Sequence, residues 1–192
     1  MILEGIVTTI SATGQVNIAP MGPRVEPAME HLLLRPFPTS RTYRNLKVHG
    51  EGVFHVIDDV FLLARAAVGT AEPLPPLVPA QHVHGFILSH ACQAYEFRVL
   101  KMDESQERVA IDGEVVHVHR MRDFLGFNRA KHAVVEAAIL ATRRHLLPRD
   151  QIKAEYDKLA VLVEKTGGPQ ERDAFAFLSD YLDQPQTTEP NV

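Results

Sequence analysis

Apolar and β-branched residues gather in short runs through the first part of the chain, and such runs are typical of β-strands. Residues 2–10 and 15–19 have this character and are separated by the turn signal SATG, so they predict a β-hairpin. Residues 31–37 form another apolar run, which ends among prolines because proline cannot donate to a sheet ladder. Three strands are therefore expected before residue 38.

Two short helices are expected to interrupt the strands. Thr39 and Ser40 are good N-cap residues, and they precede a segment of helical composition, residues 41–48. An extended run at residues 52–57 follows. The aspartate pair at 58 and 59 can then cap a second helix that has one apolar side.

The middle of the chain predicts a long hairpin after an irregular connection. Residues 72–79 contain four prolines and are expected to be a loop or crossover. Residues 94–102 and 108–120 are extended runs around a polar turn, so they predict two long paired strands.

Helical patterns dominate the last third of the sequence. Residues 128–147 are rich in alanine, residues 150–165 carry apolar positions at helical spacing, and the sequence Gly-Gly-Pro at 167–169 precedes a last helix. Residues beyond Asp183 have no apolar face and are expected to form a mobile tail.

Together these elements predict a mainly β fold with added helices. Six or seven mostly antiparallel strands suit a small closed barrel, and 192 residues leave room for a helical appendage. The expected domains are a barrel at residues 1–122, a helical extension packed on the barrel at residues 123–183, and a flexible tail at residues 184–192.

Composition and charge indicate which classes of partner and which location to expect. The formal charge of −4 and the isoelectric point near 6.2 give no general attraction for nucleic acid or anionic membranes, so neither is expected as a partner. The lone cysteine, Cys92, forms no internal disulfide, and the first ten residues lack a basic leader. No apolar run approaches the roughly 20 residues of a membrane-spanning helix. We therefore expect a cytoplasmic protein.

The polar cluster at the start of the first helix is the best candidate for an anion site. A helix N-terminus presents unpaired N–H groups and the positive end of the helix dipole, and Arg41 adds a fixed charge. A phosphomonoester would fit these groups. The alternative is an ordinary capped helix with a solvated arginine.

Several sequence blocks resemble the FMN-binding split-barrel superfamily, which contains the flavin reductases and pyridoxamine phosphate oxidases. The blocks are NIAPMG at residues 17–22, RPFPTSRTYRNL at 35–46 and GVFHVIDDVF at 52–61. NRAKHAVVEAAILATR at residues 128–143 resembles the helical extension of one branch of this superfamily. The resemblance implies a split β-barrel with a C-terminal helical extension, with FMN as the cofactor.

The resemblance also implies roles for individual residues. Residues alongside the isoalloxazine ring would be Asn17, Ala19 and Met21, and residues that grip the FMN phosphate would be Thr39, Ser40, Arg41 and Thr42. Asn45 would orient the phosphate loop or the ribityl chain. Independently of the resemblance, Arg129 and Lys131 stand at the start of a helix whose alanines permit close packing, so either residue could lean over the phosphate; the alternative is a solvated basic end. His55 stands where flavin reductases often have asparagine, which leaves the role of this position open. No catalytic acid or base is singled out.

The resemblance further implies a homodimer with the flavin between subunits. The expected function is FMN binding, either in an oxidoreductase that uses a small-molecule substrate or electron donor, or in a non-catalytic flavin-binding or interaction protein. A second alternative is a metal-binding β-barrel protein, since the His82/His84 and His117/His119 pairs each point to one face of a strand. We expect no metal, because no carboxylate or cysteine pattern completes a familiar signature.

Overall fold

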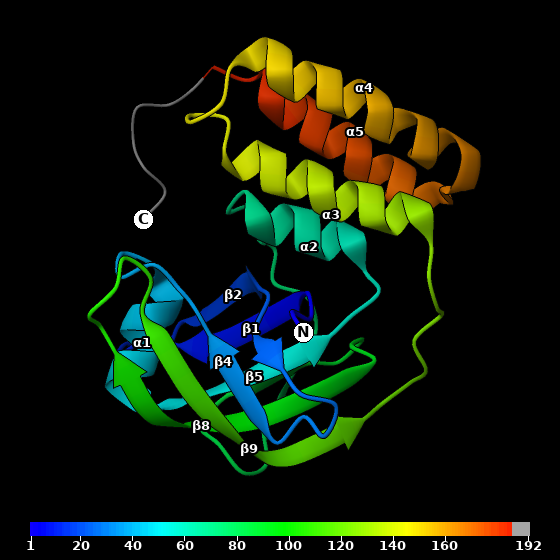
Figure 1. Ribbon diagram of the computed structural model, residues 1–192. Coiled ribbons are helices and arrows are strands. Elements are labelled where there is room, and N and C mark those ends of the chain that lie inside the picture. The colour runs from blue at the N-terminus through cyan, green and yellow to red at the C-terminus, as the bar shows by residue number, and fades with distance from the viewer. Residues whose placement is uncertain (186–192) are drawn as a thin grey trace. The chain divides into compact units, whose positions relative to one another are not determined.

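A computed structural model describes residues 1–185, which form two compact units (Figure 1). The barrel unit contains residues 1–57 and 72–124, and the helical unit contains residues 58–71 together with the described residues from 125 onward. Residues 58–71 thus group with the helices, whereas the sequence predicts them to be part of the barrel domain. The boundaries of the predicted domains otherwise stay predictions. Of the predicted tail at residues 184–192, the part from residue 186 onward lies outside the described residues.

The barrel unit is built on an antiparallel sheet of seven strands in the order β2-β1-β5-β8-β9-β4-β3. Its strands are β1 (Gly5–Ile10), β2 (Val16–Met21), β3 (Arg24–Val25), β4 (His31–Leu34), β5 (Glu51–Val56), β8 (Gln93–Asp103) and β9 (Ala110–Arg120). The two predicted hairpins, β1–β2 and β8–β9, are both present. The mainly β class with added helices is therefore confirmed.

The sheet curls because the segment before β1 bonds to the strand at its opposite edge. Leu3 N–H donates to the Pro23 carbonyl at 3.1 Å, and the Met1 and Val25 backbones exchange two further hydrogen bonds. The segment leading into β1, the second strand of the order, thus reaches β3 at the opposite edge, as the closing of a small barrel requires.

Phe97 is fully buried at the centre of the barrel core. A Cβ atom added at Gly52 on β5 or at Gly113 on β9 would lie 2.8 Å from its ring, so both neighbouring strands need glycine there. Around it pack apolar side chains from several strands and from helix α1 (Arg41–His49), including Val7, Leu32, Leu34, Leu46, Phe54 and Ile111. Helix α1 is thus fixed to the sheet by its buried side.

A second, two-stranded sheet corrects the prediction of a loop at residues 72–79. Strand β6 (Leu77–Pro79) pairs with β7 (Phe86–Leu88), and the proline is tolerated because it lies at the end of a short edge strand. The turn between these strands is fastened to the main sheet by Glu96 of β8, which is fully buried. Its carboxylate accepts backbone hydrogen bonds of 2.9, 2.6 and 2.9 Å from Gln81, His82 and Val83.

The helical unit contains α2 (Val60–Ala67), α3 (Arg129–Thr142), α4 (Arg149–Thr166) and α5 (Pro169–Asp183), and α3 packs against the other three (Figure 1). The alanine side of α3 is buried, which allows close packing. Helix α3 ends at Thr142 instead of continuing to the predicted Leu147, because a turn precedes Pro148. Among residues 1–185, no helix combines the length and apolar character needed to cross a lipid bilayer.

One ion pair joins three helices of this unit. Lys131 of α3 lies 2.7 Å from a carboxylate oxygen of Glu171 on α5, and it also donates to the Asp58 carbonyl just before α2. Burial alone would raise the pKa of Glu171, but the hydrogen bonds from Lys131 and from the Gly168 N–H lower it. The carboxylate is therefore held in its charged form.

Candidate functional site

The four residues predicted to hold the phosphate differ in their roles at the start of helix α1: one caps the helix, two are exposed and one is buried. The Ser40 hydroxyl caps the helix, since it accepts from the Tyr43 N–H at 3.2 Å and donates to the Phe37 carbonyl at 2.8 Å. Thr39 and Arg41 are exposed, and Arg41 has no side-chain partner among residues 1–185. The first-turn N–H groups and the Arg41 guanidinium together make an electropositive surface.

Thr42 is buried and belongs to a polar network behind this surface. The Asn17 amide donates to the Thr42 hydroxyl at 3.1 Å and, at 3.4 Å, to the Thr9 hydroxyl. The Asn45 amide donates to the same Thr9 hydroxyl at 3.0 Å. The structure therefore brings together three of the predicted residues, Asn17, Thr42 and Asn45, and ties the first turns of α1 to strands β1 and β2.

This network leaves hydrogen-bonding capacity for a ligand. The Thr42 hydroxyl accepts from Asn17, so its own proton stays available, and the amide oxygens of Asn17 and Asn45 have no partner in the described chain. Neither oxygen is sealed inside the protein without a partner, so both are accessible to a ligand. The arrangement fits a ligand that carries both acceptor and donor groups.

Asn17, Ala19 and Met21 lie on β2, which is an edge strand of the seven-stranded sheet. Within the described residues β2 pairs on one side only, with β1, so alternate backbone N–H and C=O groups face away from the ladder. All three residues are half-buried. A planar ligand with polar edge atoms could bond to this strand through its backbone.

Arg129 is the first residue of α3 and belongs to the helical unit. Its side chain is exposed, and the N-cap of this helix is Asn128, whose side chain accepts from the N–H groups of Ala130 and Lys131. The contact of Arg129 with an FMN phosphate stays a prediction.

His55 has a structural role that the sequence left open. Its ring is fully buried on β5, and Nε2 accepts from the Leu88 N–H at 3.1 Å, so Nδ1 carries the proton and donates to the Ile6 carbonyl at 3.1 Å. Burial lowers the pKa of His55 to about 4. The neutral imidazole therefore links β7 to β5 and β1.

Three of the four paired histidines, His82, His117 and His119, lie near Glu96, whereas the His84 ring lies 5.5 Å from that of His49 between centroids. His119 is 2.6 Å from the carboxylate of Glu96, and the His117 ring stacks on His82 with centroids 4.2 Å apart. Within residues 1–185, however, no three or more histidine, cysteine, aspartate or glutamate side chains are grouped as a metal would require. The geometry instead indicates that His117 and His119 help to hold the turn at residues 80–85, through the His82 ring and through Glu96.

Thr9 is the site residue that sequence reasoning missed. It is buried on β1 and receives hydrogen bonds from both asparagines of the network. A threonine inside a β-branched strand is indistinguishable by pattern from its neighbour Thr8, whose hydroxyl bonds to the Phe86 carbonyl. Only the register that places Thr9 opposite Asn17 could have identified it.

Solved structures similar to this chain share its fold. An FMN-bound protein of Methanosarcina mazei, described as belonging to DUF447, is 22% identical with a TM-score of 0.81, and the match covers 94% of each chain. Flavoredoxin of Desulfovibrio vulgaris is 15% identical over 62% of this chain and 69% of its own, with a TM-score of 0.54.

A third structure is an FMN-binding protein of Thermus thermophilus with bound 1-cyclohex-2-enone. It is 18% identical over 62% of this chain and 70% of its own, with a TM-score of 0.52. The Methanosarcina mazei structure, which matches 94% of this chain, confirms the predicted split-barrel fold with a helical extension. No curated protein matches the sequence.

The family is shown by the sequence itself. Residues 3–122 match the N-terminal domain of the family described as "Protein of unknown function (DUF447)", and residues 128–180 match its C-terminal counterpart. The first match alone spans more than half of the 192 residues. The chain is therefore a member of the DUF447 family.

Proposed function

We propose that this chain binds FMN in the barrel unit, with the phosphate at the start of helix α1. The observation that carries the proposal is the guanidinium of Arg41, which has no partner within residues 1–185 and stands at the first-turn N–H groups of a helix that a buried polar network holds in place. The FMN-bound DUF447 protein of Methanosarcina mazei, similar over 94% of this chain, supports the same cofactor.

The residues present fit the parts of FMN. Arg41, the exposed Thr39 hydroxyl and the helix N–H groups would hold the phosphate, and the amide oxygens of Asn17 and Asn45 would accept from ribityl hydroxyls. The free edge of β2, at Ala19 and Met21, would bond to the polar edge of the isoalloxazine ring. We keep Arg129 as a further phosphate contact.

Bound FMN would supply redox chemistry, since a flavin can accept and release electrons. The part of the protein in this proposal is to bind and orient the cofactor. We favour a flavin-dependent oxidoreductase over a purely flavin-binding protein, because the similar structures include flavoredoxin and an FMN-binding protein with a bound enone. We also propose a cytoplasmic location, as expected of a chain whose single cysteine, Cys92, leaves no internal disulfide to form.

We also propose a homodimer, in which the flavin at the free edge of β2 would lie between the two copies. Sedimentation at micromolar concentration is expected to give twice the chain mass. A strictly monomeric protein in the presence of FMN would contradict the dimer.

Flavin titrations of the purified protein test the cofactor. After endogenous flavin is removed, FMN is expected to bind more tightly than riboflavin, because only FMN offers the phosphate, and more tightly than FAD, because no dinucleotide motif is present. Quenching of flavin fluorescence measures each affinity. Equal affinities for FMN and riboflavin would contradict the phosphate assignment, and absence of flavin binding would contradict the proposed function.

A further inference from the structure

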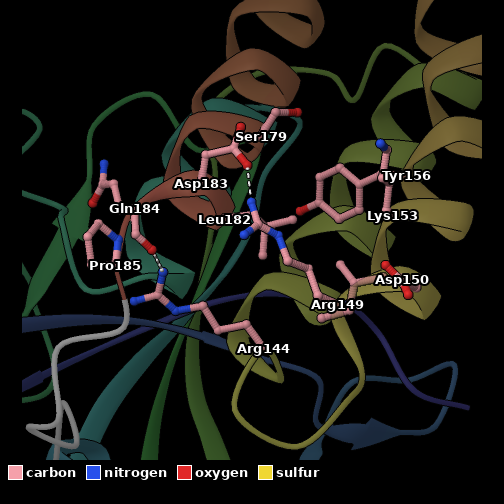
Figure 2. Close-up of a pocket in the computed structure, with 11 residues that line it drawn as sticks. Arg144, Arg149, Asp150, Lys153, Tyr156, Ser179, Leu182, Asp183, Gln184 and Pro185 are labelled. Atoms are coloured by element: carbon pink, nitrogen blue, oxygen red, sulfur yellow. Dashed lines mark hydrogen bonds and ion pairs between the residues drawn. The ribbon is translucent and has the colours of Figure 1, made fainter.

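The helical unit contains a pocket of about 770 Å³ that none of the residues assigned to FMN lines. Its walls come from the turn that follows α3, the first turns of α4 and the end of α5, and Figure 2 shows their side chains gathered around it. Three separate segments of the chain thus contribute to one hollow.

Carbon atoms form much of the pocket wall. Ile152 and Tyr156 on α4 are buried, and Leu182 on α5 lines the same hollow. The Tyr156 hydroxyl already donates to the Ala137 carbonyl at 2.7 Å, so this side chain contributes mainly its ring. Such a wall favours a ligand with an apolar body.

Cations outnumber carboxylates around the pocket. Arg149 and Lys153 are four residues apart on α4 and therefore lie on the same side of that helix. Arg144 adds a third cation, against the two carboxylates of Asp150 and Asp183.

These cations differ in how firmly they are held. Arg144 donates to the carbonyls of Tyr181 and Gln184, and its guanidinium lies 4.1 Å from the Tyr181 ring centroid. Arg149 makes an exposed ion pair of 2.8 Å with Asp183, as Figure 2 shows. Lys153 has no hydrogen-bond partner among residues 1–185.

We propose that this pocket binds a small amphiphilic monoanion, an aliphatic or aromatic carboxylate, independently of FMN. The carboxylate would bond to Arg149 and Lys153, and the apolar body would lie against Ile152 and Leu182. An exposed ion pair contributes little stability, so Arg149 can turn from Asp183 to the ligand at small cost. The excess of one cation selects an anion over a cation of the same shape.

The test uses two probes of equal length and opposite charge, octanoate and octylammonium. Each is titrated into the full chain carrying ¹³C-labelled isoleucine methyl groups, with and without FMN. The Ile152 methyl signal, assigned with an Ile152→Val variant, is expected to shift saturably with octanoate. Octylammonium is expected to bind at least about tenfold more weakly, because it meets like charge.

Variants on one helix sharpen the test. Lys153→Met and Arg149→Met are expected to weaken octanoate binding by about tenfold or more each, through loss of a charge-assisted hydrogen bond. Lys158→Met is the matched control, since Lys158 lies on the same helix, is exposed and does not line the pocket. The probe comparison on the unmodified chain stands even if a variant fails to fold.

Three outcomes would overturn the proposal. The first is an Ile152 signal that neither probe moves, and the second is equal binding of the two probes. The third concerns residues 186–192, because the chain continues from Pro185, which lines the pocket. If octanoate binds only to a variant that ends at Pro185, the pocket receives the chain's own terminal segment instead of a small anion.

Discussion

The side-chain amide of Asn45 donates a hydrogen bond of 3.0 Å to the hydroxyl of Thr9, and this bond joins helix α1 to strand β1 inside the barrel unit. Both residues are buried. The helix that begins with the proposed phosphate site is thus positioned by a polar contact as well as by its apolar side.

Replacing Asn45 by alanine is expected to destabilise the flavin-free protein by about 1–2 kcal/mol, because a buried hydrogen bond is lost. Arg44→Ala is the matched control, since Arg44 is the preceding residue and is exposed. Urea unfolding measures both. Equal stability of the two variants would show that the Asn45–Thr9 bond does not contribute.

Replacing Arg41 by alanine is expected to weaken FMN binding by about 1.5–3 kcal/mol and to leave riboflavin binding nearly unchanged, because the guanidinium would contact only the phosphate. Arg44→Ala again serves as the control, with the same loss of charge on the same helix. An equal loss of affinity for both flavins would place Arg41 away from the phosphate.

Acidification is expected to destabilise the barrel unit through His55. Burial lowers the folded-state pKa of His55 to about 4 from an ordinary 6.5, so the unfolded chain binds an additional proton between these values. Stability therefore decreases as the pH falls from about 6.5 towards 4, by up to about 3 kcal/mol in total.

A His55→Gln variant keeps a neutral polar side chain and is expected to lose this part of the pH dependence. Urea unfolding between about pH 6.5 and 5 measures the effect, because ordinary carboxylates titrate mainly below that range. Parallel pH profiles for the variant and the parent would mean that His55 is not responsible.

Replacing Lys131 by methionine is expected to destabilise the helical unit by about 3–5 kcal/mol, because it leaves the buried carboxylate of Glu171 without its cation. Lys158→Met is the control, since the exposed Lys158–Glu155 pair contributes no more than about 1 kcal/mol. The circular dichroism of the helices during urea unfolding reports both.

A double variant, Lys131→Met with Glu171→Met, is expected to recover much of the lost stability, because no unpaired buried charge remains. A Lys131→Met protein as stable as the Lys158→Met protein would contradict the proposed role of this pair.

The elements with a clear periodicity were predictable from the sequence, and those that depend on distant contacts were not. The hairpin of β8 and β9 has long extended runs, and α3 has an alanine side, so local pattern identifies both. The pairing of β6 with β7 was missed, because the strands are short and one ends in Pro79.

The candidate site divides in the same way. The helix cap at Ser40 follows from local sequence, whereas the role of Thr9 depends on a register with Asn17 and on a contact with Asn45 far along the chain. His55 could not be interpreted for the same reason, since its two partners, Ile6 and Leu88, are set by tertiary structure.

The carboxylate of Glu96 gives the turn between β6 and β7 an unusual dynamic property. The amides of Gln81, His82 and Val83 all donate to this one side chain. Breaking these hydrogen bonds therefore requires the three residues to move together. Exchange of these three amide protons with deuterated solvent should therefore be slow and should occur at a common rate, set by the departure of the whole turn from Glu96. The three residues therefore open as one unit, because a single side chain of the neighbouring sheet holds them all.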